Sequence, residues 1–462
     1  MKYVSTRGQA EPVDFVEACM TGLAPDGGLF VPESWPQIAP ASATESYVDV
    51  ATRILKAFAG DSLSDADVRG LCERAYATFS HHSVAPLVQT GSNQFMMELH
   101  HGPTLAFKDV AMQFIGQLYD LVLERRGQRM SVVCATSGDT GGAAAAAFAG
   151  ATSVDLFILH PHERVSPVQR LFMTTTGEAN VHNLAVEGDF DDCQALVKAM
   201  FADKPFSQDV NLSGVNSINW ARIAAQSVYY ATAQATVGRD RPIRFVVPSG
   251  NMGDAFAGYV AARCGLLSGF EIVCAVNENK TLSTLLTDGL MQREQAVATP
   301  SPAMDISVPS NFERLFFEVA GRDGDVVRRT YDQYRQSSST ILPETVRGPL
   351  ACTGFSSEVV TNSDTLAEMR TFKSETGYLI CPHTAVGTAA ERRLNQSDAC
   401  SIVLSTAHAA KFPETVLEAT GDDAPLPSRC DELKTRQERF ERVANDLAVI
   451  KAHIRTQMRA EA

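Results

Sequence analysis

Short runs of apolar, β-branched residues alternate with helical patterns along much of the chain. Each run is continuously apolar and ends in a glycine or in a polar turn. Continuous apolar strands that alternate with helices are typical of a parallel sheet covered on both faces. The runs lie at 130–137, 153–161, 181–188, 243–254, 270–277 and 401–406. The sequence therefore predicts an α/β fold, in which ligands bind at the carboxyl ends of the strands.

Three segments fall outside this alternation. Residues 1–85 are rich in turns and carry a helical pattern near 47–58, which indicates a separate N-terminal domain. Residues 281–350 interrupt the catalytic region, 86–430, as a long insertion. The charged tail, 431–462, has helical periodicity and predicts a C-terminal helix docked along one apolar edge, with a partner-binding helix as the alternative.

Composition excludes several classes of protein. The 462 residues carry a formal charge of −14, which argues against broad binding to nucleic acid or to anionic membranes. No apolar run is long enough to span a bilayer, and the N-terminus has no apolar signal core. The ten cysteines are scattered without a CxxC pair, which favours a reduced cytoplasmic protein with no disulfide framework and no metal site.

The stretch PSGNMGD (248–254) lies between an expected strand and an expected helix. Glycines let successive backbone N–H groups point at one ligand, and the start of a helix adds the positive end of its dipole. Such a loop can hold a phosphate without any basic side chain. The alternative is an ordinary strand-to-helix turn, which can have the same sequence pattern. Its spacing is neither GxGxxG nor GxxxxGK[ST], so neither common nucleotide loop is present.

The stretch ATSGDTGG (135–142) is a second turn of this kind. We expect Ser137, Thr140 and the neighbouring N–H groups to hold a carboxylate at the start of the following helix. The alternative is a simple helix cap made by Ser137 or Asp139.

Lys108 stands inside HGPTLAFKD, between a polar turn and an apolar helical stripe. A lysine whose pKa is lowered by burial or by a neighbouring cation can attack a carbonyl and form a Schiff base. Taken alone, Lys108 is better explained as a surface lysine lying along apolar neighbours. A lysine together with a phosphate loop and a carboxylate site suits pyridoxal 5'-phosphate.

Two further stretches carry candidate ligand-binding residues. Thr406 follows the last predicted strand within STAHAAKF (405–412), where the edge of a cofactor ring could lie, and Lys411 belongs to the same stretch. Asn219 and Arg222 stand in NSINWAR (216–222), and arginine is suited to phosphate oxygens.

Five stretches in this order closely resemble the threonine synthase family, in its longer bacterial and fungal form. They are HGPTLAFKD, ATSGDTG, NSINWAR, PSGNMGD and SPAMDISVPSNFERLFFE, and YVSTRG with APDGGLFVPE resembles the N-terminal domain of that family. The resemblance implies a fold-type-II pyridoxal-phosphate enzyme, related to the tryptophan synthase β-subunit, that converts O-phospho-L-homoserine and water to L-threonine and phosphate. This reaction would be the last step of threonine biosynthesis, in the aspartate family of amino acids.

The resemblance also implies roles for individual residues. Lys108 would be the Schiff-base lysine, and Thr406 would face the pyridine nitrogen. The phosphate loop would comprise Gly250, Asn251, Met252, Gly253 and Asp254, with Met252 where related chains often have phenylalanine. With this chemistry in view, we expect Ser137 and Thr140 to bind the substrate carboxylate, and Asn219, Arg222 and Lys411 to bind the leaving phosphate. Since the turn reads SGDTG where related enzymes often have SGNTG, the partner of the cofactor's phenolic oxygen stays open.

Other readings remain at this point. A phospho-lyase of the same fold, which releases a 2-oxo acid and ammonia, would share every cofactor motif. A non-catalytic binding protein on the same scaffold is a second alternative, which the presence of Lys108 opposes. We expect a small-molecule substrate, no nucleic-acid or membrane partner, and a monomer, with a dimer as the alternative.

Overall fold

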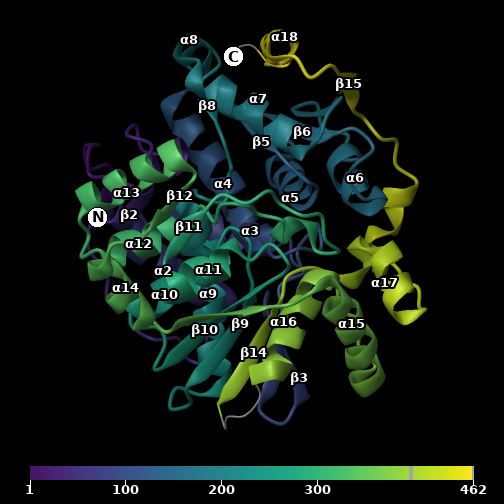
Figure 1. Cartoon of the computed structure of the whole chain (residues 1–462). Coiled ribbons are helices and arrows are strands. Elements are labelled where there is room, and N and C mark those ends of the chain that lie inside the picture. The colour runs from purple at the N-terminus through teal and green to yellow at the C-terminus, as the bar shows by residue number, and fades with distance from the viewer. Residues whose placement is uncertain (395–398, 460–462) are drawn as a thin grey trace.

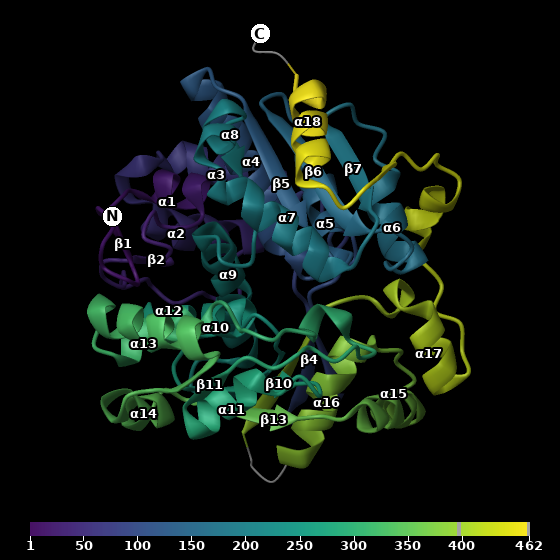
Figure 2. The ribbon, with the colours of Figure 1, turned by 45° about the horizontal axis from the view of Figure 1, so that its top comes forward.

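The computed structural model describes residues 1–394 and 399–459, which fold around two sheets with helices on their faces (Figure 1). Figure 2 shows the two sheets in separate halves of the molecule, with the N-terminal region at one side. The predicted α/β class, with parallel sheets and a separate N-terminal domain, is confirmed.

The first sheet has five parallel strands in the order β15-β7-β6-β5-β8. The strands are β5 (Met130–Ala135), β6 (Val154–Pro161), β7 (Val181–Val186), β8 (Leu212–Ser213) and β15 (Glu441–Val443). β5, β6 and β7 are the apolar runs that the sequence predicted, and β6 is buried along its whole length. Burial on both faces explains why their sequences show no alternation.

The second sheet has six strands in the order β13-β10-β9-β14-β4-β3, and only β3 is antiparallel to its neighbour. The strands are β3 (Leu87–Gly91), β4 (Gln94–Glu98), β9 (Ile243–Pro248), β10 (Phe270–Val276), β13 (Phe355–Val359) and β14 (Cys400–Ser405). The sequence analysis missed β3, β4 and β13. These strands are only partly buried and carry polar residues, so they lack the continuous apolar run that marked the others.

The helices that cover the two sheets follow the strands in the expected alternation. They are α4 (Lys108–Arg126), α5 (Asp139–Phe148), α6 (Pro167–Thr174), α7 (Phe190–Ala202), α8 (Lys204–Asp209), α9 (Trp220–Val237), α10 (Gly253–Arg263), α15 (Asn362–Thr376), α16 (Pro382–Leu394) and α17 (Pro413–Thr420).

The N-terminal region contains a two-stranded sheet and three helices. Its elements are β1 (Tyr3–Ser5), α1 (Phe15–Thr21), β2 (Phe30–Pro32), α2 (Tyr47–Ala59) and α3 (Asp65–Tyr76). α2 begins at the expected residue because the Ser46 hydroxyl accepts a hydrogen bond from the N–H of Asp49 at 3.2 Å. α2 and α3 pack against α9 and α4, so this region buttresses the helix that begins at Lys108.

The insertion is mostly helical. It contains α11 (Thr281–Asp288), α12 (Phe312–Val319), α13 (Gly324–Ser337) and α14 (Glu344–Ala351), with β11 (Leu290–Gln292) paired to β12 (Ser339–Ile341) and a 3₁₀ turn at Pro302–Met304. The buried Arg314 of α12 donates to the carbonyl of Phe30 at 3.0 Å and to the side chain of Asn311. The insertion is therefore tied to the N-terminal region.

The tail differs from the single helix that its periodicity predicted. It forms a 3₁₀ segment (Ser428–Lys434), then β15, which extends the first sheet beside β7, and only then α18 (Leu447–Gln457). α18 does dock along an apolar edge, because Ile450 and Ile454 are buried in one cluster with residues of β6, β7 and α7. Figure 2 shows α18, in yellow, above that part of the sheet.

The described part of the chain has neither a membrane-spanning helix nor a cluster of metal-ligating side chains. No helix there is both long and apolar enough to cross a membrane. Within residues 1–394 and 399–459, His, Cys, Asp and Glu side chains form no group of three or more arranged for a metal ion.

Candidate active site

A short backbone pairing brings Lys108 next to the end of β14. Ala106 and Ala407 form an isolated antiparallel bridge, and the N–H of Phe107 donates to the carbonyl of Thr406 at 2.8 Å. Lys108 is the first residue of α4, and Thr406 directly follows β14. Two predicted site residues that are almost 300 positions apart in sequence are thus neighbours.

Lys108 is buried beside a carboxylate. Its Nζ lies 3.4 Å from Oδ2 of Asp139, the first residue of α5, and only 9% of the residue is exposed. Burial lowers the pKa of Lys108, and the positive charges of Arg222 and Lys411 lower it further, while Asp139 opposes them. A larger fraction of this amine is therefore uncharged at a given pH than for a free lysine, as a nucleophile or base requires.

Asp139 connects the two sheets at their carboxyl ends. Its Oδ1 accepts from Nζ of Lys411 at 2.7 Å and from Nε2 of Gln169 at 2.9 Å. Burial alone would raise the pKa of Asp139, but Lys411 and Lys108 outweigh burial and hold that pKa well below its usual range. Asp139 follows β5 and Lys411 follows β14, so this buried ion pair joins the two halves of the molecule. From its sequence context, Asp139 is only a candidate helix cap, so its role in this ion pair was not predicted.

The turn after β5 is closed by Thr136. Its hydroxyl accepts from the N–H groups of Gly138 and Gly141, each at 2.9 Å. Neither Ser137 nor Asp139 caps the helix, which corrects the alternative reading of this turn. The side chains of Ser137 and Thr140 are partly exposed and make no hydrogen bond to any residue of the described chain, so both are open to a ligand.

Gly138 is required at this turn for two reasons. Its φ is +138°, which L side chains rarely adopt, and an added Cβ would lie 2.6 Å from Cδ of Gln169. The absence of a side chain lets Gln169 reach Asp139.

The predicted phosphate loop, 250–254, lies where the chain passes from β9 to α10. Met252 has a left-handed conformation (φ +61°), and its side chain is buried in the main core. α10 begins at Gly253, and the first N–H groups of a helix have no partner within the helix. The backbone N–H groups of Gly250, Asn251 and Met252 donate to no acceptor among the described residues, which suits an anion bound through N–H groups.

The insertion holds this loop in place. Asn311 donates from its side chain to the carbonyls of Asn251 at 3.1 Å and Ser217 at 3.2 Å. A Cβ on Gly250 would come within 2.9 Å of Cγ1 of Ile306 and 3.1 Å of the carbonyl oxygen of Ala303. Gly250 is therefore needed for the close approach of the insertion to the loop.

The carboxylate of Asp254 does not belong to the anion-binding surface. Tyr229 and Tyr230 both donate to its Oδ1, the latter at 3.1 Å. Burial raises the pKa of Asp254 to about 6, against these hydrogen bonds and the charge of Arg222. Only the backbone of Asp254 is available for the role that the resemblance implied.

Asn219 and Arg222 were both expected to bind the leaving phosphate, but their side chains differ in their contacts. Both ends of the Asn219 amide are committed to protein: its Nδ2 donates to the carbonyl of Cys19 at 2.7 Å and its Oδ1 caps α9 at the N–H of Ala221. Asn219 is thus a structural residue, which corrects the expectation that it binds phosphate. Its partner Cys19 belongs to the N-terminal region, which local sequence could not reveal.

Arg222 is buried without a hydrogen-bond or ion-pair partner in the described part of the chain. Only 4% of the residue is exposed, and its guanidinium makes no hydrogen bond or ion pair with any residue in 1–394 or 399–459. Burial lowers its pKa to about 10, so it stays charged at neutral pH. Buried charges in proteins are normally paired, so the guanidinium of Arg222 is available to bind an anionic ligand.

The sequence analysis missed Gln169 and His383. Gln169, in α6, holds Asp139, and His383, in α16, is a buried imidazole whose pKa is lowered by burial and affected by Asp139, Lys108 and Lys411. A single glutamine or histidine at the start of an apolar helix carries no sequence signal that distinguishes a site residue from a core residue.

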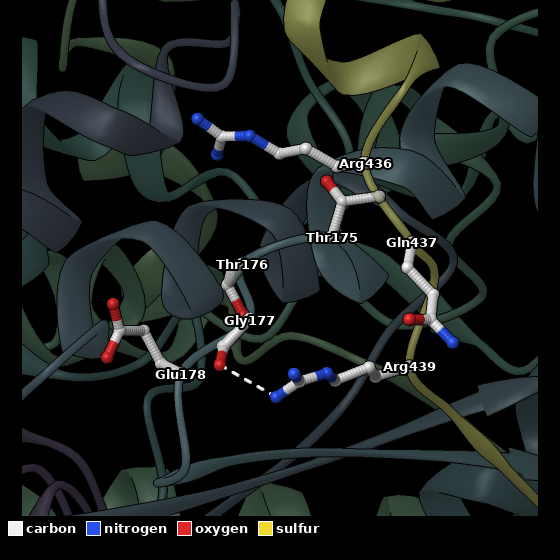
Figure 3. A pocket seen from close by; sticks show the side chains of 7 residues that line it. All are labelled: Thr175, Thr176, Gly177, Glu178, Arg436, Gln437 and Arg439. Atoms are coloured by element: carbon white, nitrogen blue, oxygen red, sulfur yellow. Dashed lines mark hydrogen bonds between the residues drawn. The ribbon is translucent and has the colours of Figure 1, made fainter.

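A surface cavity of about 400 Å³ lies elsewhere, where the tail crosses the segment before β7 (Figure 3). It is lined by Thr175, Thr176, Gly177, Glu178, Arg436, Gln437 and Arg439. Arg439 donates to the carbonyl of Gly177 at 2.8 Å, as the dashed line in Figure 3 marks. This cavity is at the amino end of β7, whereas ligands of such sheets bind at carboxyl ends.

The geometry fits pyridoxal phosphate. A buried amine with a lowered pKa, a loop with free N–H groups and a buried arginine, the last two without partners in the described residues, lie where the carboxyl ends of both sheets meet. A family model described as pyridoxal-phosphate dependent enzyme matches residues 85–405. The fold and the site thus define a fold-type-II pyridoxal-phosphate-dependent enzyme.

The comparisons also identify the family. Models described as threonine synthase N terminus and as threonine synthase, C-terminal, match residues 2–76 and 384–454. A threonine synthase of Pseudomonas aeruginosa is 43% identical, with 98% of each chain covered. The crystal structure of a threonine synthase from Brucella melitensis, bound to pyridoxal phosphate, superimposes with a TM-score of 0.95 at 46% identity over 100% of both chains. The yeast threonine synthase structure gives 0.92 at 38% identity over 99% of this chain and 98% of that one. The chain belongs to the threonine synthase family and is a pyridoxal-phosphate-dependent lyase.

Proposed function

We propose that this enzyme converts O-phospho-L-homoserine and water to L-threonine and phosphate. The observation that carries the proposal is Arg222, a buried and unpaired cation close enough to Lys108 to lower its pKa. A substrate phosphate would supply the missing negative charge, and arginine binds phosphate oxygens through paired N–H groups. Membership of the threonine synthase family supports the same reaction.

Separate groups of residues would bind the cofactor phosphate, the substrate carboxylate and the cofactor ring. The N–H groups of Gly250, Asn251, Met252, Gly253 and Asp254 would hold the cofactor phosphate. Ser137 and Thr140, whose hydroxyls are open, would bind the substrate carboxylate beside the start of α5. Thr406 would face the pyridine nitrogen, since the bridge between Ala106 and Ala407 fixes it beside Lys108.

Lys108 would move the protons. Pyridoxal phosphate, when bound, supplies the electron sink that makes the α-carbon of an amino acid acidic. Lys108 would remove and return protons on one face of the substrate, with Asp139 holding its amine in place at 3.4 Å. Lys411 donates to both Asp139 and the carbonyl of Thr104, so we assign it to orienting Asp139 and give it a smaller part in binding the leaving phosphate.

Replacing Arg222 with methionine should weaken substrate binding without lowering the thermal stability of the free enzyme. Loss of a charge-assisted hydrogen bond costs about 1.5–3 kcal/mol, so the KM for O-phosphohomoserine should rise by roughly 10- to 150-fold. Because the buried guanidinium of Arg222 makes no hydrogen bond or ion pair within the described residues, and Asp254 acts on it only at longer range, methionine should leave the thermal midpoint of the free enzyme nearly unchanged. Steady-state kinetics and thermal unfolding give the two quantities.

Two controls accompany this variant. Arg222→Lys keeps the charge and should lose less affinity than Arg222→Met. A non-phosphorylated amino-acid inhibitor should bind both variants nearly as well as it binds the parent enzyme. If Arg222→Met weakened both ligands equally and lowered the midpoint, Arg222 would be a structural residue.

A product assay tests the proposed reaction itself. The purified enzyme, given O-phosphohomoserine, should release threonine and phosphate in equal amounts. A phospho-lyase of the same fold would release 2-oxobutyrate and ammonia instead, so the appearance of 2-oxobutyrate as the main product would overturn the proposal.

We also propose the division 1–85, 86–430 and 431–462. The family models that end at residue 76 and begin at residue 85 support the first boundary. The second rests on the change to a tail that adds β15 and α18 to the first sheet. We further propose a cytoplasmic monomer, which is supported by ten free cysteines and by large exposed apolar side chains that come from separate segments.

A further inference from the structure

His383 lies against the end of β14, beside the proposed site. It is the second residue of α16, only 4% of it is exposed, and its ring centroid lies 4.8 Å from that of Phe412. The hydroxyl of its neighbour Thr384 is 3.4 Å from the hydroxyl of Ser405, the residue before Thr406. The first turn of α16 therefore borders the position of Thr406.

One hydrogen bond decides which ring nitrogen of His383 carries the proton. The backbone N–H of Ala303 points at Nε2 with a separation of 3.2 Å. A backbone N–H can only donate, so Nε2 must accept, and a neutral imidazole then carries its proton on Nδ1. Burial, together with the charges of Lys108 and Lys411, lowers the pKa of His383 to about 4 against the opposing charge of Asp139, so the ring is neutral at physiological pH.

The Nδ1–H donor has no acceptor among the residues that the structure describes. Nδ1 is fully buried and makes no hydrogen bond to any residue that the structure describes. Asp139, the charged acceptor that acts on this ring, already accepts from Lys411, Gln169 and Lys108. A buried donor without an acceptor is costly, and buried polar groups of native proteins almost always have a partner.

We propose that His383 is a ligand-contacting residue that donates its Nδ1 proton in a hydrogen bond to an anionic oxygen bound beside Lys108. The inference rests on the proposed position of the site. The oxygen belongs to one of two sources, the phenolic oxygen of the cofactor or an oxygen of the substrate's carboxylate or phosphate. A neutral donor suits this place, because a third cation next to Lys108 and Lys411 would be costly.

Ala303 fixes this donor relative to the phosphate loop. The same residue whose N–H orients His383 places its carbonyl oxygen 3.1 Å from the position of a Cβ on Gly250. The insertion therefore sets the distance between the loop and the His383 ring. In this way a segment that only interrupts the strand-helix alternation in sequence helps to shape the ligand-binding surface.

Two amide variants separate the two nitrogens of His383. In His383→Gln the amide lies near the Nε2 position, so it can accept from Ala303 but offers no donor at Nδ1. In His383→Asn the amide lies near the Nδ1 position and can donate there, but the bond from Ala303 is lost. Each variant is prepared as the holoenzyme, and its thermal midpoint is recorded to confirm the fold.

The readouts are the dissociation constant and pH-dependent absorbance of the bound pyridoxal phosphate, together with the KM for O-phosphohomoserine. His383→Gln should weaken one ligand by roughly 10- to 100-fold, whereas His383→Asn should stay closer to the parent enzyme for that ligand. A shift in cofactor affinity and absorbance would assign the oxygen to the cofactor. A change confined to the KM would assign it to the substrate.

The opposite order of effects would overturn the inference. If His383→Gln matched the parent enzyme in both ligands, or if His383→Asn were the more damaged variant, His383 would serve only to hold Ala303. This outcome is distinct from failure of the proposed function, because an enzyme that released 2-oxobutyrate would still bind the cofactor and a phosphorylated amino acid. In that case the ligand affinities of His383→Gln and His383→Asn could still be compared.

Discussion

Lys108→Ala should reduce turnover by at least about a thousandfold while the protein remains folded. A positioned general base alone contributes roughly 10²- to 10⁴-fold, and Lys108 is proposed both to anchor the cofactor and to transfer protons. The fold should survive because Lys411 and Gln169 still hold Asp139 in place. Single-turnover and steady-state assays with O-phosphohomoserine measure the loss, and circular dichroism checks the fold.

Lys108→Arg is the matched control for this prediction. Arginine keeps a positive charge beside Asp139 but cannot give up its proton in a protein, so it cannot act as a base. We therefore expect Lys108→Arg to be as inactive as Lys108→Ala. If Lys108→Arg recovered turnover, the lysine would serve only as a counter-ion for Asp139, and the base would have to be sought elsewhere.

The buried strands of both sheets were predictable because burial on two faces leaves a continuous apolar run. The strands that the sequence analysis missed, such as β4 and β13, lie in less buried positions and carry polar side chains. The tail was predicted as a single helix, without β15, for a related reason. β15 has three residues and pairs with β7, and nothing in three charged and apolar residues distinguishes such an edge strand from part of a helix.

The chemistry of single residues was predictable where the residue type limits the choice. A lysine at the mouth of an apolar helix and a glycine loop after a buried strand both carried local signals. The long-range contacts that place these residues in the site carried no local sequence signal. Lys108 meets Thr406 only through a bridge between Ala106 and Ala407, and Asp139 gains its role from Lys411, which lies 272 positions later in the chain (411 minus 139).

Long-range contacts also explain why Asn219 does not fit the phosphate-binding role that the sequence suggested. Asn219 and Arg222 stand in the same motif, but the side chain of Asn219 turns toward Cys19 in the N-terminal region. Arg222, one helical turn later, has no such partner. Sequence spacing predicted that both would be near the site, whereas only the packing of the N-terminal region decides which of them is free to bind an anion.

Asp139→Asn should lower the free energy of unfolding of the cofactor-free enzyme by about 3–5 kcal/mol. Asparagine is nearly the same size but carries no charge, so the buried ammonium group of Lys411 would lose the negative charge of the carboxylate that lies 2.7 Å away. Breaking one side of a buried ion pair is costly because the other charge stays buried without compensation. Urea unfolding at pH 7 measures the difference. Glu432→Gln, which removes an exposed carboxylate paired with Arg436, is the control and should leave the midpoint unchanged.

The pH dependence and a double variant test the cause of this loss. The folded pKa of Asp139 is lowered, so its stabilisation is complete above the unfolded value of about 3.9 and is lost as the pH falls below that value. The gap between the parent enzyme and Asp139→Asn should therefore stay constant from neutral pH down to about 5 and narrow below about 4. Adding Lys411→Met should restore part of the stability, because methionine can pack on the Phe172 ring, 5.3 Å from where the ammonium now lies. If the double variant were less stable than Asp139→Asn alone, the loss would come from the hydrogen bonds of Asp139 to Gln169 and not from an uncompensated buried charge.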